Sequence, residues 1–146
     1  MVLCFWASPQ PARAEPATPS QILFLHLRLT NGTVVLLSSR ERPGVLKGTG
    51  GHVQKHGLHY QVRAGTGQTI WEATIAHPGR FDLEYPDAQA PGQLGRKRVE
   101  RQNVDFIIRI PNHPDAVKVE FSEIPEFPEK ESPRSLGTVI LKKTGA

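Results

Sequence analysis

The sequence predicts an all-β protein, a single antiparallel β-sandwich of about eight strands with an immunoglobulin-like or jelly-roll-like arrangement. Apolar residues recur at every second position through most of residues 21–142, which is the spacing of strands with one buried face. Turn signals separate these segments: 13 glycines and 13 prolines make 26 of 146 residues, about 18% against a usual sum of roughly 12%. No segment shows convincing helical periodicity. A closed barrel is the alternative.

The first two strands are predicted on either side of a tight turn. In residues 21–29 four leucines occupy alternate positions, so we expect the leucines to face the core. Asn31-Gly32 follows, and this pair accepts the positive φ angles of a two-residue hairpin turn. The chain is therefore expected to double back through residues 34–39. Asn31-Gly32-Thr33 also matches the N-glycosylation pattern, but the turn already explains it.

The middle of the chain predicts three more strands, at residues 58–64, 71–75 and 81–85. Residues 45–57 are rich in glycine and are expected to form a loop. The sequence Gly65-Thr66-Gly67-Gln68 predicts a second hairpin turn. Pro86 should end the third of these strands, because proline cannot donate a backbone hydrogen bond. The polar residues 87–98 are expected to form a loop that ends in basic side chains.

The last three strands are predicted at residues 104–110, 117–121 and 136–142. Ile107 makes the first of them apolar on both faces, which favours a central place in its sheet. Residues 111–114 contain two prolines and predict a rigid turn. Residues 124–133 contain three prolines and are expected to run extended over the surface.

Residues 1–14 resemble the rear part of a secretory signal peptide. An apolar block precedes Ala12-Arg13-Ala14, which has the form of a cleavage site, although the positively charged front region is missing. The alternative is an unstructured N-terminus with an apolar tip. Residues 15–20 are a Pro-rich linker, which leaves 21–146 as the sandwich domain. The predicted location is extracytoplasmic, periplasmic or secreted, and no apolar stretch reaches the roughly 18 residues of a transmembrane helix.

Charge and cysteine content narrow the possible functions further. Cys4 is the only cysteine and lies in the segment expected to be removed, so no disulfide framework and no cysteine-based metal site is predicted. Cleavage after Ala14 reduces the 18 basic residues to 17 against 14 acidic ones, so the net charge falls from +4 to +3. A charge this small argues against a dedicated nucleic-acid-binding protein.

Three histidines, His52, His56 and His59, are the candidate metal ligands. Neutral imidazole is a common ligand of Zn²⁺ and Cu²⁺, and three of them lie within eight positions. Neighbouring glycines argue against a helix here, and the zinc-peptidase pattern H-E-x-x-H is absent. The alternative is a solvated loop without ligand geometry. No cofactor is required by the sequence, and zinc or copper is the candidate.

A basic run is the candidate partner-binding site, and it consists of Arg96, Lys97, Arg98 and Arg101. An acidic run follows at residues 120–131. Separated charge of this kind can steer an anionic partner, whether a protein, a glycan or a lipid surface. The alternative is a solvated loop that aids solubility. No aromatic residue flanks the basic run, which argues against nucleic acid as the partner.

Familiar catalytic motifs are absent from the chain. Residues 47–51 (KGTGG) lack the Gly-Lys-Ser/Thr of a phosphate-binding loop, and no G-x-S-x-G elbow occurs. The outward carboxylates of Asp82, Glu84, Asp105 and Glu120 could pair across a sheet, but solvated strand faces explain them.

Residues 104–121 (VDFIIRIPNHPDAVKVEF) resemble part of an accessory β-sandwich. The shared elements are an apolar strand ending in Arg109-Ile110-Pro111, a short turn, Ala116 and an alternating strand. The domain concerned lies N-terminal to the catalytic domain of IgA-type zinc metallopeptidases. The resemblance implies a non-catalytic sandwich that is exported and peptidase-associated. Because the zinc ligands of that family lie in its catalytic domain, no site residue is carried over.

We therefore expect an exported, non-enzymatic β-sandwich that acts as a binding or accessory module. Its recognition surfaces are expected in the loops at residues 40–57 and 87–101, because loops on a rigid scaffold usually carry binding. A periplasmic metal-binding protein that uses the histidine-rich loop is the second hypothesis. The third is a hydrolase whose site the sequence does not reveal.

Overall fold

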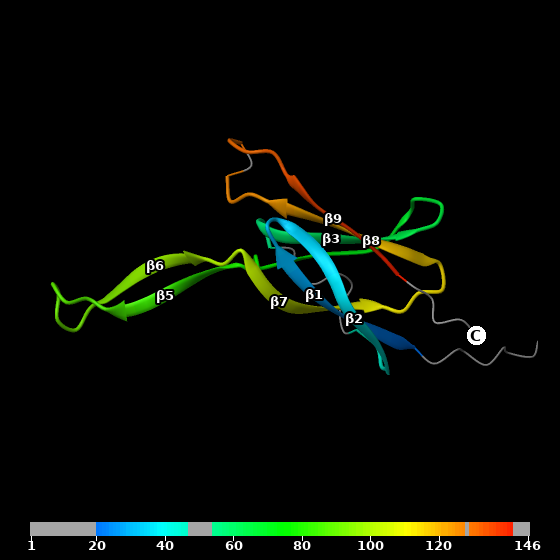
Figure 1. The fold of residues 1–146 in the computed structure, drawn as a ribbon, viewed down its shortest axis with the longest axis horizontal. Coiled ribbons are helices and arrows are strands. Elements are labelled where there is room, and N and C mark those ends of the chain that lie inside the picture. The colour runs from blue at the N-terminus through cyan, green and yellow to red at the C-terminus, as the bar shows by residue number, and fades with distance from the viewer. Residues whose placement is uncertain (1–19, 47–53, 128, 142–146) are drawn as a thin grey trace, which may run out of the picture.

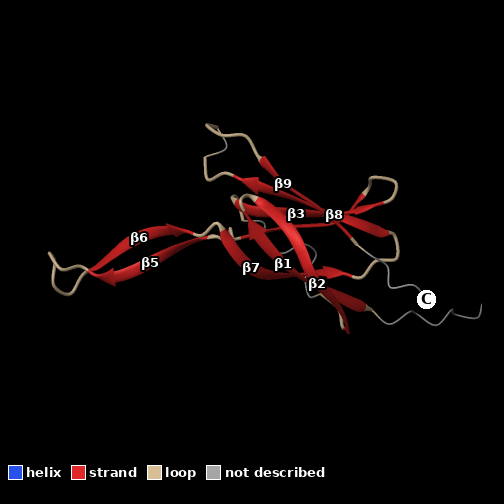
Figure 2. Cartoon of the chain, viewed as in Figure 1, coloured by secondary structure: helices blue, strands red, loops and turns tan. Residues whose placement is uncertain are grey.

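The structure is a computed structural model that describes residues 20–46, 54–127 and 129–141. Over these ranges the chain is all-β and contains no helix, which confirms the predicted fold class (Figures 1 and 2). The strands are β1 (Gln21–Thr30), β2 (Thr33–Pro43), β3 (Gly57–Ala64), β4 (Thr69–Ile75), β5 (Arg80–Pro86), β6 (Leu94–Glu100), β7 (Asn103–Pro111), β8 (Ala116–Ile124) and β9 (Arg134–Ile140).

Two antiparallel sheets pack into the sandwich. The first has the order β2-β1-β7 and the second the order β4-β3-β8-β9. Inward side chains of both sheets form one core, with Leu25 and Leu27 from β1, Leu58 and Val62 from β3, and Phe121 from β8 almost completely buried. The strand alternation in the sequence follows from this arrangement, because only one face of each sheet is covered.

The predicted β1–β2 hairpin is present. Thr30 pairs with Thr33 across the turn, and the two turn residues have positive φ angles, 48° at Asn31 and 76° at Gly32. These angles are those of a type I′ turn, whose twist matches that of the flanking strands. The hairpin fixes the register of β2 against β1, and with it the positions of the side chains on the outer face of this sheet.

A third sheet consists of β5 and β6 alone, and it projects from the sandwich as a two-stranded arm (Figure 1). The prediction of a loop is wrong for residues 94–100, which belong to β6, and for residues 40–43, which belong to β2. β6 has little apolar alternation, so its sequence lacks the usual signal. It is paired with β5 from Arg80 opposite Glu100 to Pro86 opposite Leu94.

The predicted central place of β7 is also wrong. β1 is the central strand of its sheet, and β7 pairs only with β1. Ile107 is 63% exposed on the outer face. Ile107 is therefore an exposed apolar residue on the sheet surface, and β7 does not have a second buried face.

Candidate functional site

The structure places only part of the predicted metal site. His52 lies outside the described residues. His56 is exposed just before β3, and His59 lies on the outer face of β3. His59 Nδ1 is 3.0 Å from Thr74 Oγ1, and His59 Nε2 is 4.0 Å from a carboxylate oxygen of Glu72. Among the residues with described positions, no three His, Cys, Asp or Glu side chains are grouped to hold a metal ion. The three-histidine site stays a prediction.

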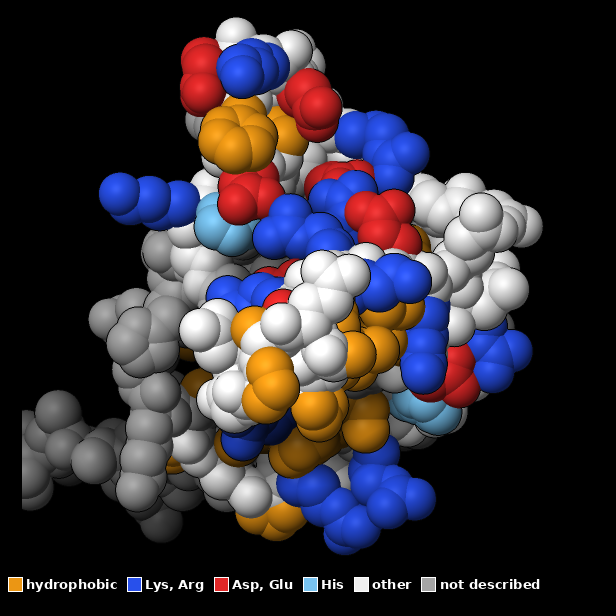
Figure 3. Space-filling model, turned by 90° about the vertical axis from the view of Figure 1, so that its left-hand side faces the viewer, with side chains coloured by type: hydrophobic (Ala, Val, Ile, Leu, Met, Phe, Trp, Pro, Cys, Tyr) orange, Lys and Arg blue, Asp and Glu red, His pale blue; other side chains and the backbone are white. Residues whose placement is uncertain are grey.

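The basic run is divided between the two faces of β6. Arg96 and Arg98 point to one face and Lys97 to the other, while Arg101 lies just beyond the strand. Arg96 Nη2 is 3.0 Å from Glu84 Oε1, and Arg98 Nη1 is 2.8 Å from Glu126 Oε2. The run is therefore not a continuous basic surface, and Figure 3 shows acidic and basic side chains intermixed at this end of the molecule.

The basic run is paired with acidic residues of β5, and this pairing was not predicted from the sequence. Asp82 and Glu84 lie on β5 directly opposite Arg98 and Arg96, and Arg98 Nε is 3.4 Å from Asp82 Oδ1. Arg101 has a different contact, because its guanidinium carbon lies 5.0 Å from the centre of the Phe81 ring. An anionic partner at the basic run would have to compete with these contacts.

The opposite face of the arm is largely apolar. Phe81, Leu83 and Tyr85 share it with Lys97 and Gly95, and Leu83 and Tyr85 are about half exposed. A Cβ atom added at Gly95 would lie 2.7 Å from a ring carbon of Tyr85. The glycine thus leaves room for the tyrosine ring to cross the ribbon, as aromatic side chains often do over glycines in sheets.

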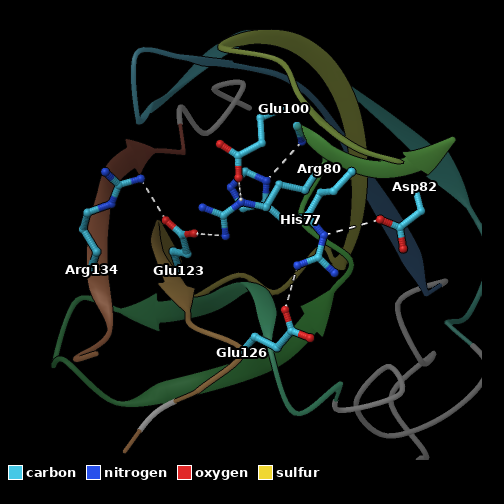
Figure 4. Close-up of polar contacts among 9 residues, drawn as sticks. His77, Arg80, Asp82, Glu100, Glu123, Glu126 and Arg134 are labelled. Atoms are coloured by element: carbon cyan, nitrogen blue, oxygen red, sulfur yellow. Dashed lines mark hydrogen bonds and ion pairs between the residues drawn. The ribbon is translucent and has the colours of Figure 1, made fainter. Parts of the chain in front are cut away.

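A charged cluster joins the arm to the sandwich (Figure 4). At its centre is Glu123 of β8, whose side chain is only 9% exposed. Glu123 forms an ion pair with Arg80 of β5 and a second with Arg134 of β9, whose Nη2 is 2.8 Å from Glu123 Oε2. Arg80 Nε also donates a hydrogen bond of 2.7 Å to Glu100. We call these four residues the arm anchor.

Electrostatics at the arm anchor favour ionised Glu123 and neutral His77. Burial alone would raise the pKa of Glu123, but Arg80 and the hydrogen bond from Arg134 outweigh it and hold this pKa below its ordinary value. Burial, together with the charge of Arg80, lowers the pKa of His77. His77 Nδ1 accepts a hydrogen bond of 3.2 Å from the backbone N–H of Gly79, which requires that nitrogen to be unprotonated.

The arrangement at the arm anchor favours a structural role over acid–base chemistry. An open cleft of about 380 Å³ lies beside it, with His56, His77 and Phe127 among its walls. Four carboxylates at or beside this cleft are in ion pairs with arginines: Asp82, Glu100, Glu123 and Glu126. Glu131 also lines the cleft, is exposed, and has no ion pair among the described residues. A general acid or base needs a carboxylate or imidazole that can exchange its proton near neutral pH, and pairing with arginine opposes this in the four paired carboxylates.

A second surface is the outer face of the β2-β1-β7 sheet. Phe24 of β1 has Arg40 of β2 on one side and Arg109 of β7 on the other. In the adjacent rows, Arg42 lies opposite Ile22, and Ile107 lies opposite His26. A shallow groove of about 360 Å³ is lined by Phe24, His26, Ser38, Arg40, Arg42 and Ile107. We call the surface formed by Phe24, Arg40, Arg42, Ile107 and Arg109 the arginine face.

Charge on the arginine face is only partly neutralised. Asp105 lies at one end and binds Arg28 through both carboxylate oxygens, at 2.6 and 2.9 Å. The hydrogen bonds from Arg28 lower the pKa of Asp105. In the part of the chain that the structure describes, Arg40, Arg42 and Arg109 form no ion pair. Three arginines around a half-buried phenylalanine and an exposed isoleucine are therefore available to an external anion.

The fold and these surfaces define the class of molecule: an all-β, sandwich-like protein with a projecting two-stranded arm. The described residues include no helix long and apolar enough to cross a membrane. Comparisons with protein-family models, curated proteins and solved structures found no match to this chain. The resemblance of residues 104–121 to a peptidase accessory domain therefore stays a prediction.

Proposed function

We propose that this protein is a non-enzymatic binding module that holds an anionic partner against the arginine face. The observation that supports this most directly is the row Arg40–Phe24–Arg109, in which two arginines without an acidic partner among the described residues flank an aromatic ring. Guanidinium groups bind carboxylates, phosphates and sulfates through two parallel hydrogen bonds. The face therefore has the chemistry of an anion-binding surface.

The apolar residues of the arginine face also support the proposal that this face binds an anionic partner. Phe24 is half-buried and Ile107 is 63% exposed, so both lie within reach of a ligand in the groove. When a ligand covers such residues, water is excluded and the attraction between arginine and anion increases. The basic run on the arm has fewer unpaired cations, so the arginine face is the better candidate for the predicted anionic partner.

Binding to a soluble polyanion tests this function. We choose heparin as the probe and the double variant Arg40→Gln/Arg109→Gln, and we expect its heparin affinity to fall roughly 25-fold, since each exposed cation near an anionic surface contributes about 1 kcal/mol. The matched control is Lys55→Gln/Lys97→Gln, which removes the same charge away from the face. An equal loss of affinity in the control would contradict the proposal and would favour unspecific attraction or the basic run.

The proposal includes the exported location and accessory role that the N-terminal residues and the local resemblance predict. Export would place the arginine face in contact with anionic polymers and surfaces outside the cytoplasm. This part of the proposal is independent of the arginine face, and N-terminal sequencing of the mature protein tests it.

A further inference from the structure

We infer that the anionic partner is the headgroup surface of a phospholipid membrane, which the arginine face meets side-on. This inference rests on the proposed function and names the partner of the same site. Three features of the arginine face support a membrane as the partner: its exposed aliphatic side chains, the spacing of its arginines and its shallow shape.

Exposed aliphatic residues lie next to the arginines. Ile107 is 63% exposed, and Val35, opposite Arg28 on the outer side of β2, is 38% exposed. A soluble sugar polymer would gain little from contact with such side chains, because sugar rings are bound mainly by aromatic and polar groups, and Phe24 is the one aromatic residue of the groove. At a membrane, by contrast, aliphatic side chains enter the boundary between headgroups and acyl chains while arginines remain at the phosphates.

The arginines are spread widely enough to bind separate headgroups. Arg40 and Arg109 lie on the two edge strands of the three-stranded sheet, and two strand spacings amount to about 10 Å. Arg42 lies further along β2. A flat array of phosphates can contact all three arginines at once, whereas a single small anion cannot.

The groove is shallow, and the charge of the face opposes self-association. With a volume of about 360 Å³ and six lining residues from all three strands, the groove offers a broad surface rather than a deep pocket for one side chain. A second copy of the chain would bring Arg40, Arg42 and Arg109 against the same residues of its partner. Like charges placed opposite each other are unfavourable, so a membrane surface is the better occupant than a second copy.

Vesicle co-sedimentation tests the inference. The probes are vesicles of phosphatidylcholine with and without phosphatidylglycerol. We expect the protein to sediment only with vesicles that contain phosphatidylglycerol, and the bound fraction to fall as salt is added. Since each arginine near an anionic membrane contributes about fivefold to partitioning, Arg40→Gln/Arg109→Gln should lower the partition coefficient roughly 25-fold. The control Lys55→Gln/Lys130→Gln, which lies outside both the arginine face and the basic run, should retain most of it.

A second variant separates a membrane from a soluble polyanion. Ile107→Thr keeps a β-branched side chain and the net charge, and we expect it to weaken binding to anionic vesicles much more than binding to heparin. Equal effects on both ligands would overturn the membrane inference. So would tighter binding to poly-glutamate than to vesicles, which would identify an acidic protein as the partner.

The failures of the two proposals are distinguishable. If the arginine face binds heparin but no vesicles, the membrane inference is overturned and the proposed function stands. If neither heparin nor vesicles bind, or if the arginine variants bind as the unmodified protein does, both are overturned. Melting temperatures of the Arg40→Gln/Arg109→Gln and Ile107→Thr variants should match that of the unmodified protein, because these side chains lie on the outer face of the sheet.

Discussion

Glu123 is the residue on which attachment of the arm most depends. Its carboxylate lies between Arg80 of the arm and Arg134 of β9, and it is nearly buried. A buried ion pair adds modestly to stability when intact, but removal of one partner leaves the other charge without compensation. Loss of the Glu123 charge should therefore reduce the stability of the fold more than loss of any one of the exposed ion pairs along the arm.

Substitution of Glu123 should destabilise the protein clearly. For Glu123→Gln we expect the free energy of unfolding in urea to fall by about 2 kcal/mol, because Arg134 loses its carboxylate partner, Arg80 keeps only Glu100, and both arginines are partly exposed. The control is Glu84→Gln, which removes an exposed pair with Arg96 and should cost less than about 1 kcal/mol. Similar losses in the two variants would show that Glu123 has no special role.

The lowered pKa values of His77 and Glu123 predict two steps of acid destabilisation. Because folding lowers the pKa of His77, the unfolded chain binds the proton first, and stability falls as pH drops below about 6.5. The pKa of Glu123 is also lowered, so its contribution is present above about pH 4.5 and is lost as pH falls further. Unfolding measured across pH should show that His77→Gln removes the upper step, while Glu123→Gln reduces the lower one. A single step unaffected by either change would contradict this assignment.

The histidine hypothesis can be tested without knowledge of the loop structure. If His52, His56 and His59 bind one ion, addition of Zn²⁺ or Cu²⁺ should raise the melting temperature, since a ligand that binds only the folded state stabilises it. His56→Ala should abolish this rise. An unchanged melting temperature in the unmodified protein would rule out a tight metal site.

At the level of elements, the strands that face the core and β5 of the arm were predictable, whereas β6 was not. The leucines of β1 and the alternation in β3 and β8 reflect burial of one face, and the sequence records that burial directly. In β6, by contrast, the pairing partners are Asp82 and Glu84 of another strand, and no local pattern reveals them. Sequence periodicity therefore identifies strands with one apolar face, including β5, and it does not identify an exposed strand such as β6 whose side chains are mostly charged.

The arginine face was missed for a related reason. Arg40 and Arg42 lie on β2 and Arg109 lies on β7, so their proximity depends on the registers of two strand pairs. β2 also contains a bulge, because His26 pairs with Ser38 but Leu27 pairs with Leu36. Only with this bulge do Arg40 and Arg42 face outward on the same side as Phe24. Alternation counted along β2 from Val34 places them on the inner face.

The arm should be the least protected part of the described fold. β5 and β6 pair only with each other and are open to solvent on both faces, and an isolated two-stranded ribbon is marginally stable in water. We expect the amide hydrogens of β5 and β6 to exchange faster than those of β1 and β3, which pair on both sides. Hydrogen exchange followed by mass spectrometry measures this. Equal protection would indicate that the apolar face of the arm is covered in solution.

At the scale of the whole molecule, export is the prediction that decides where the protein works. If residues 1–14 belong to a signal peptide, the mature chain should begin at Glu15. N-terminal sequencing of the protein expressed from its complete reading frame, after fractionation of the cells, measures this. Protein found in the cytoplasm with residues 1–14 intact would contradict the prediction.

The base of the arm has a consequence for how this molecule can be changed. The backbone N–H of Arg101 donates a hydrogen bond of 2.7 Å to the carbonyl oxygen of Gly79, so the two ends of the arm lie side by side where the arm joins the sandwich. Within the described ranges, residues 80–100 take part in no strand pairing outside the arm. Residues 81–99 could therefore be exchanged for another hairpin, or shortened in the course of evolution, while Arg80 and Glu100 stay in the arm anchor and both sheets of the sandwich keep every pairing they have.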